Sequence, residues 1–161
     1  MDNFSFQKHI LIVGKTEKER HKKLNQILEN NNLELIRFPQ SMKSLSDYLN
    51  VVQAKKLFYP FYETKGKYNQ NQIFDFHIDW IAENNCLFVF EEFQKVDDKF
   101  GLEIMRIMIN NLEVNHQTAT KIIITLEDET VFINSLSEII NKTKYKNKDQ
   151  ILESNLQIIA F

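Results

Sequence analysis

The chain consists of short apolar runs separated by longer amphipathic stretches, an order that predicts strands alternating with helices. The apolar runs have the length and the branched residues of buried strands, and they lie at residues 9–13, 33–38, 86–90, 122–126 and 156–161. In the stretches between them, apolar residues recur every three or four positions, as on one face of a helix. These helical patterns cover residues 17–29, 44–53, 75–83, 100–112 and 131–142.

This order predicts a single α/β domain over residues 1–161, with a central, mainly parallel sheet of about five strands. Parallel strands need long crossover connections, and the predicted helices supply them on both faces of the sheet. The chain is long enough for one sizeable core, and neither an internal repeat nor a linker interrupts the pattern. The predicted fold class is therefore a three-layer sandwich.

The composition argues against several classes of protein but does not indicate a function. Hydrophobic residues make up 43% of the sequence and charged residues 26%, as in ordinary globular proteins. The net charge of −2 gives no attraction to nucleic acid or to an anionic membrane. The single cysteine, Cys86, lies in an apolar run, so it is expected in the core, and no disulfide can form within the chain. Apolar runs are far shorter than the roughly 20 residues of a membrane span, and no signal peptide is recognisable, so we expect a cytoplasmic protein.

The first motif with chemical content is Gly14-Lys15-Thr16, between the first predicted strand and the first predicted helix. Two interpretations are open. Thr16 and Glu19 have the spacing of a capping box, in which the threonine only begins the helix. Alternatively, the free N–H groups and the dipole at this helix N-terminus contact an anion.

The second motif is the acidic pair Glu91-Glu92, directly after the predicted strand 86–90. Ligands gather at the carboxyl ends of strands in open parallel sheets, and the motif at Gly14 is expected at the same edge. The pair is then part of a functional site, or it is simply exposed charge at the end of a strand. The histidines show no spacing typical of metal ligands, so zinc is not expected.

Together the two motifs resemble the P-loop NTPases, and within them the AAA+ superfamily. Residues 83–93, followed by 101–108, are similar to the Walker B strand and the next helix of bacterial enhancer-binding activators. The resemblance implies that Glu91 helps to hold magnesium and that Glu92 polarises the attacking water. It also implies a sensor strand at 121–126, with Thr125 as its polar residue.

For the first motif, the resemblance implies a nucleotide-binding loop at Gly14, with Lys15 on the phosphates and Thr16 on magnesium. The implied cofactor is ATP or ADP with magnesium. A working loop reads G-x-x-x-x-G-K-[ST], however, and here a single glycine precedes Lys15 and Thr16. A domain with no cofactor is therefore the alternative.

Further differences from the AAA+ family pattern argue against ATP hydrolysis by the chain alone. Glu91 stands where the family has aspartate. The chain has three arginines, Arg20, Arg37 and Arg106, and none follows the sensor strand, where the family has its arginine finger. We also expect no helical lid after the last strand. These departures predict that the isolated chain is not an active ATPase.

Three functions are consistent with these observations. The preferred one is a degenerate AAA+-like domain that does not hydrolyse ATP and acts as a binding or regulatory module, with a protein partner or with itself. The second is a nucleotide-binding ATPase that needs partner subunits to supply an arginine. The third is a protein-interaction domain without a nucleotide, on a receiver-like or flavodoxin-like sheet. A receiver, however, needs aspartates where this chain has Gly14 and Lys15.

Residues 58–76 are rich in aromatic side chains and lysines and follow no clear periodicity. Three interpretations are open: the rings cover the edge of the sheet, they stack on single-stranded nucleic acid, or they form a partner-binding patch. In the helix predicted at 75–83, Phe76 and Trp80 are expected to point inward.

Overall fold

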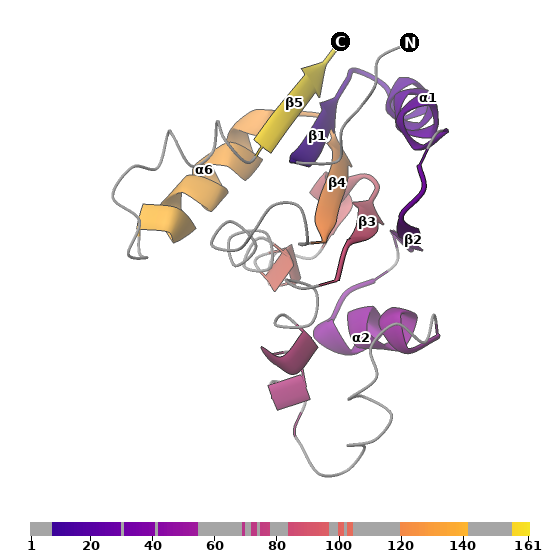
Figure 1. Cartoon of the computed structure of the whole chain (residues 1–161). Coiled ribbons are helices and arrows are strands. Elements are labelled where there is room, and N and C mark those ends of the chain that lie inside the picture. Colours follow the sequence, from indigo (N-terminus) through magenta and orange to yellow (C-terminus); the bar gives the residue numbers. More distant parts are fainter. Residues whose placement is uncertain are drawn as a thin grey trace.

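The structure is a computed structural model of the chain, shown in Figure 1. It describes residues 8–29, 31–40, 42–54, 69, 72–73, 75–77, 84–96, 100–101, 103–104, 120–141 and 156–161. Its strands are β1 (His9–Val13), β2 (Glu34–Phe38), β3 (Cys86–Phe90), β4 (Lys121–Leu126) and β5 (Leu156–Ala160). Its helices are α1 (Glu17–Leu28), α2 (Leu45–Ala54) and α6 (Glu129–Asn141), with a short 3-10 turn at Phe93–Lys95.

The five strands form one sheet in the order β2-β3-β4-β1-β5, and every pair is parallel. The predicted parallel sheet is therefore confirmed. A flavodoxin-like sheet has the order 2-1-3-4-5. Here β1 lies between β4 and β5 instead, so the receiver-like or flavodoxin-like alternative is wrong. Because all strands run in the same direction, their carboxyl ends meet at one edge of the sheet.

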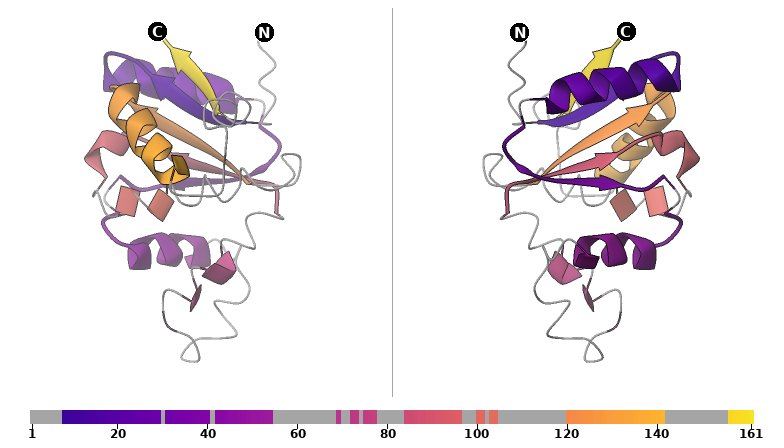
Figure 2. Two further views of the ribbon diagram at one scale, coloured as in Figure 1. Left: turned by 90° about the vertical axis from the view of Figure 1, so that its left-hand side faces the viewer. Right: turned by 90° about the vertical axis from the view of Figure 1, so that its right-hand side faces the viewer.

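Helices cover both faces of the sheet, as Figures 1 and 2 show, and this confirms the three layers. On the face of the sheet that α1 covers, Leu24 and Ile27 of the helix pack against side chains of β1, β3 and β4 in a compact apolar cluster. The opposite face holds a larger cluster, built with side chains of α2 and α6. Strands β3 and β4 are buried along their whole length, since both of their faces are covered.

Local hydrogen bonds from side chains determine where α2 begins. The backbone N–H of Asp47 donates to Ser44 Oγ at 3.2 Å, and Asp47 Oδ2 accepts from the backbone N–H of Lys43 at 3.0 Å. Side chains thus satisfy backbone groups that have no partner within the helix.

The expectation that Phe76 points inward is wrong. Its side chain is 40% exposed, whereas the neighbouring His77 is fully buried. The helical turn at 75–77 directs His77 toward α2, where its Nε2 lies 2.6 Å from the hydroxyl of Tyr48 and its ring stacks on Phe88. Burial lowers the pKa of His77 to about 3 and raises that of Tyr48 well above its usual value, so both groups are neutral in the folded protein.

Two other predictions fall largely outside the described residues. Of the helix predicted at 100–112, the structure describes residues 100–101 and 103–104, which are helical, and Phe100 and Ile104 are buried. Of the aromatic segment 58–76, residues 58–68, 70–71 and 74 lie outside, and so does Trp80. Among the helices that are described, none has the length and apolar character needed to cross a membrane.

Candidate functional site

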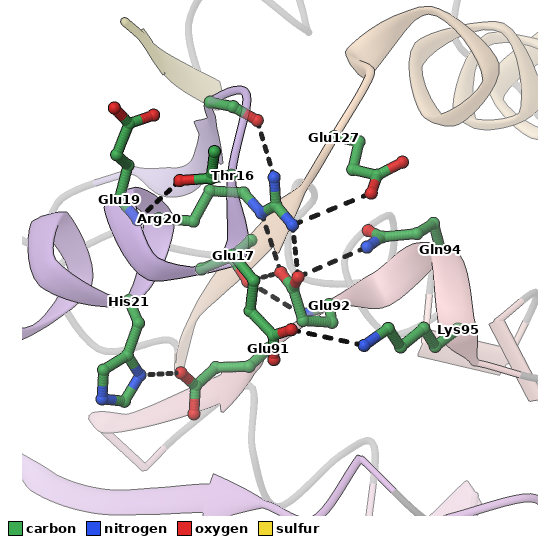
Figure 3. Close-up of polar contacts among 12 residues, drawn as sticks. Thr16, Glu17, Glu19, Arg20, His21, Glu91, Glu92, Gln94, Lys95 and Glu127 are labelled. Carbon is green, nitrogen blue, oxygen red and sulfur yellow. Dashed lines mark hydrogen bonds and ion pairs between the residues drawn. The ribbon is translucent and has the colours of Figure 1, made fainter.

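The carboxyl edge of the sheet brings the two sequence motifs together. Gly14 follows β1, Glu91 and Glu92 follow β3, and Thr125 lies near the end of β4, in register with Ile12. The first turn of α1 lies over this edge, and Figure 3 shows the polar contacts that result. The predicted residues are thus neighbours in space, as the parallel sheet requires.

At the centre of this edge lies Arg20, a residue of α1 to which the sequence analysis assigned no role. Its side chain is 2% exposed. The Nε atom donates to Glu92 Oε2 at 2.9 Å, and Nη2 donates to Glu92 Oε1, so the ion pair is bidentate. Nη1 donates to the carbonyl oxygen of Gly14 at 2.7 Å. The more exposed Glu127 lies at the margin of this contact, 4.0 Å from Nη2.

Glu92 is held by backbone and side chain alike. Its backbone lies in the left-handed region, at φ 56°, which is uncommon for a residue with a Cβ atom and costs roughly 1–2 kcal/mol. Its N–H donates to Thr125 Oγ1 at 2.8 Å, and the same hydroxyl donates to Glu92 Oε2 at 3.1 Å. This turn at the end of β3 directs the carboxylate beneath α1, where it is 2% exposed. The interpretation of Glu92 as exposed charge at a strand end is therefore wrong.

Both partners of this pair stay charged at neutral pH. Burial alone would raise the pKa of Glu92, but the hydrogen bonds from Arg20 and Thr125 outweigh it and hold the pKa below its usual value. The hydrogen bond to Glu92 in turn raises the pKa of Arg20. The carboxylate is therefore neutralised from within the chain.

Glu91 has different partners from its neighbour. Its Oε1 lies 2.6 Å from Nδ1 of His21, and its Oε2 accepts from Nη2 of Arg37 at 3.0 Å. Arg37 also donates to Asn25 Oδ1 at 3.1 Å. Glu91 therefore links β3 to α1 and to β2, and its side chain is partly exposed, at 17%.

The predicted nucleotide loop is a short, tight connection. Thr16 is the N-cap of α1, and its Oγ1 accepts from the backbone N–H of Glu19 at 3.2 Å. Lys15 and Thr16 are exposed, whereas Gly14 is buried. A Cβ atom on Gly14 would lie 2.8 Å from Cζ of Phe161, so any larger residue here would have to displace the outer end of this ring. The N–H of Phe161 donates to the carbonyl oxygen of Val13 at 3.1 Å, which fixes the end of β5 against this turn.

These residues do not fit a nucleotide with magnesium. Three residues connect β1 to α1, too few for a loop whose N–H groups surround a phosphate. The two carboxylates that could ligate the metal already contact cationic side chains, Glu92 with Arg20 and Glu91 with Arg37.

A signal for Arg20 was nevertheless present in the sequence. Residues 20, 24 and 27 lie at the spacing of one helical face, and Leu24 and Ile27 are its buried members. An arginine in line with a buried stripe needs a charged partner, because an unpaired buried charge is very costly. The pair Glu91-Glu92 offered such a partner.

Comparisons with known proteins agree with the fold. Neither a protein-family model nor a curated protein matches the sequence. Among solved structures, Cdc6p from Pyrobaculum aerophilum is similar over 96% of this chain and 39% of its own, with a TM-score of 0.54 and 9% identity. This likeness shows the fold. The domain has an AAA+-like P-loop NTPase fold.

A second similar structure is a signal transduction ATPase with numerous domains and a tetratricopeptide repeat sensor, from Pyrococcus horikoshii. It matches over 91% of this chain and 25% of its own, with a TM-score of 0.49 and 14% identity. The present chain therefore spans well under half the length of either structure.

Proposed function

We propose that this chain is a degenerate AAA+-like domain that does not hydrolyse ATP on its own and acts as a binding or regulatory module. The main support is the buried ion pair between Arg20 and Glu92. A carboxylate that polarises an attacking water must reach that water with a free oxygen. Both oxygens of Glu92 already accept hydrogen bonds, and the side chain is almost fully enclosed.

The charge at this edge supports the same conclusion. Arginine is always protonated in proteins, so Arg20 is a permanent cation in the space between α1 and the ends of β1 and β3. A magnesium ion bound there would face this cation. Removing one partner from a buried ion pair typically costs about 3–5 kcal/mol, so displacing Arg20 is unfavourable.

Phosphoryl transfer also needs positive groups around the transferred phosphate, and these must be correctly placed. Arg20 and Arg37 both form ion pairs with the glutamates of the second motif, and no arginine follows residue 106 in the sequence. The domain thus keeps the fold of a nucleotide hydrolase, while Arg20 is paired with Glu92 and Arg37 with Glu91. A domain with this fold and without a free catalytic carboxylate is suited to binding another molecule.

The test is phosphate release from ATP and magnesium by the purified chain, with calorimetric titration of ATP and ADP with and without magnesium. We expect no turnover above background and no magnesium-dependent binding. Glu92→Gln is compared with Glu127→Gln, a matched change in an exposed glutamate at the same edge. Steady release that disappears only in Glu92→Gln contradicts the proposal. Release that is equal in all three proteins comes from a contaminating enzyme.

A further inference from the structure

Strand β5 is the most exposed strand of the sheet. It lies at the end of the strand order, as Figures 1 and 2 show, and pairs with β1 from His9↔Leu156 to Val13↔Ala160. Within the described ranges no strand pairs with its other side. Ile158 is 43% exposed, and Phe161, directly after the strand, is 50% exposed.

The sequence of this edge lacks the features that usually keep sheet edges apart. Residues 156–161 contain no charged residue and no proline. The opposite edge strand, β2, has the exposed charges Glu34 and Arg37 and is followed by Pro39. Charges and prolines of this kind block pairing between chains, and an uncharged, apolar edge permits it.

We propose that β5 pairs antiparallel with β5 of a second copy of this chain, so that two five-stranded sheets join into one. With the two-fold axis at Ile158, this residue faces its own copy, Leu156 faces Ala160, and Gln157 faces Ile159. A two-fold contact uses the same patch on both chains, and no like charges oppose each other in this strand. A partner of opposite charge would find no charged side chain to recognise here.

This inference rests on the proposed function, because it names the partner of the binding module. It also links self-association to the candidate site. Phe161 follows β5 directly, its N–H donates to Val13, and its ring lies against Gly14 beside Arg20. Pairing through β5 therefore fixes the residue that covers the Gly14 turn.

The experiment is sedimentation equilibrium of the full chain over concentrations up to about 1 mM, because a contact between two short strands is small and its affinity modest. The test variants are Ile158→Lys and Ile158→Glu. The matched control is Val131→Lys, which introduces the same charge at a 72% exposed residue of α6. Circular dichroism checks that each variant is folded, and ATP turnover is measured on the same samples.

We expect the wild-type chain and Val131→Lys to form dimers, and each Ile158 variant to associate at least tenfold more weakly. An equimolar mixture of Ile158→Lys and Ile158→Glu should dimerise again, because opposite charges then face each other at the axis. A wild-type chain that stays monomeric overturns the inference, as do dimers unaffected by the Ile158 changes or a mixture that stays monomeric. ATP turnover that disappears in Glu92→Gln would overturn the proposed function and leave the dimer contact standing.

Discussion

Replacing Arg20 by methionine is the most direct test of the ion pair beneath α1. Methionine keeps much of the length and apolar stem of arginine and removes the guanidinium. The change leaves Glu92, which is 2% exposed, without its cationic partner, and it also removes the donor to the carbonyl of Gly14. Breaking a buried pair in this way typically costs about 3–5 kcal/mol, a large part of the stability of a domain of this size.

Urea unfolding at pH 7 measures this loss, and a double-mutant cycle with Glu92→Gln assigns it to the pair. Glutamine carries no charge, and it keeps an oxygen that can accept from Thr125. The double variant should therefore be more stable than the sum of the single changes predicts, by about 0.5–3 kcal/mol. The control is Arg37→Met, which removes a half-exposed partner of Glu91 and should cost at most about 1 kcal/mol.

The pH dependence gives an independent check on the same pair. The pKa of Glu92 is lower in the folded protein than its ordinary value of 4.5. The contribution of the pair is therefore complete above the unfolded pKa and is lost as the pH falls through the folded pKa. The stability difference between the wild type and Arg20→Met should narrow in acid. The argument fails if Arg20→Met costs less than about 1 kcal/mol at pH 7, or if the two changes are additive.

Two further changes test the buried histidine and the start of α1. Because the pKa of His77 is about 3 in the folded protein against an ordinary 6.5, its contribution to the free energy of unfolding should fall by about 1.2 kcal/mol from pH 6 to 5. Urea unfolding should show a shallower slope in His77→Gln than in the wild type, and equal slopes in the two proteins refute this. Thr16→Ala should lower stability by about 1 kcal/mol and Thr16→Asp should not, since aspartate also caps helices. Thermal unfolding that is unchanged in Thr16→Ala would count against the cap.

The strands were predictable because their pattern depends on local sequence. Residues 9–13 and 86–90 are continuous apolar runs, typical of strands covered on both faces, and the structure gives both runs their predicted bounds. The turn at 75–77 was not predictable in the same way. Hydrophobicity favoured Phe76 as the buried side chain, but the hydroxyl of Tyr48 on α2 forms a hydrogen bond with His77 that the ring of Phe76 cannot form. That partner lies 29 residues away, outside any local pattern.

The difference between local patterns and long-range contacts also explains why the sequence did not predict Arg20 as part of the candidate site. The carboxyl ends of parallel strands lie at one edge of a sheet, so the meeting of Gly14 with Glu92 follows from strand direction alone. Arg20 and Glu92 are 72 residues apart, and each residue alone is ordinary: an arginine on a charged helix, a glutamate after a strand. Their pairing changes the chemistry of the edge, because a cation of the chain itself now neutralises the carboxylate that the AAA+ resemblance assigns to catalysis. A search for the pattern G-x-x-x-x-G-K-[ST] reports only that some of its residues are absent from the turn at Gly14. The position of Arg20, in line with the buried stripe of α1, indicates in addition which cation lies at this edge of the sheet.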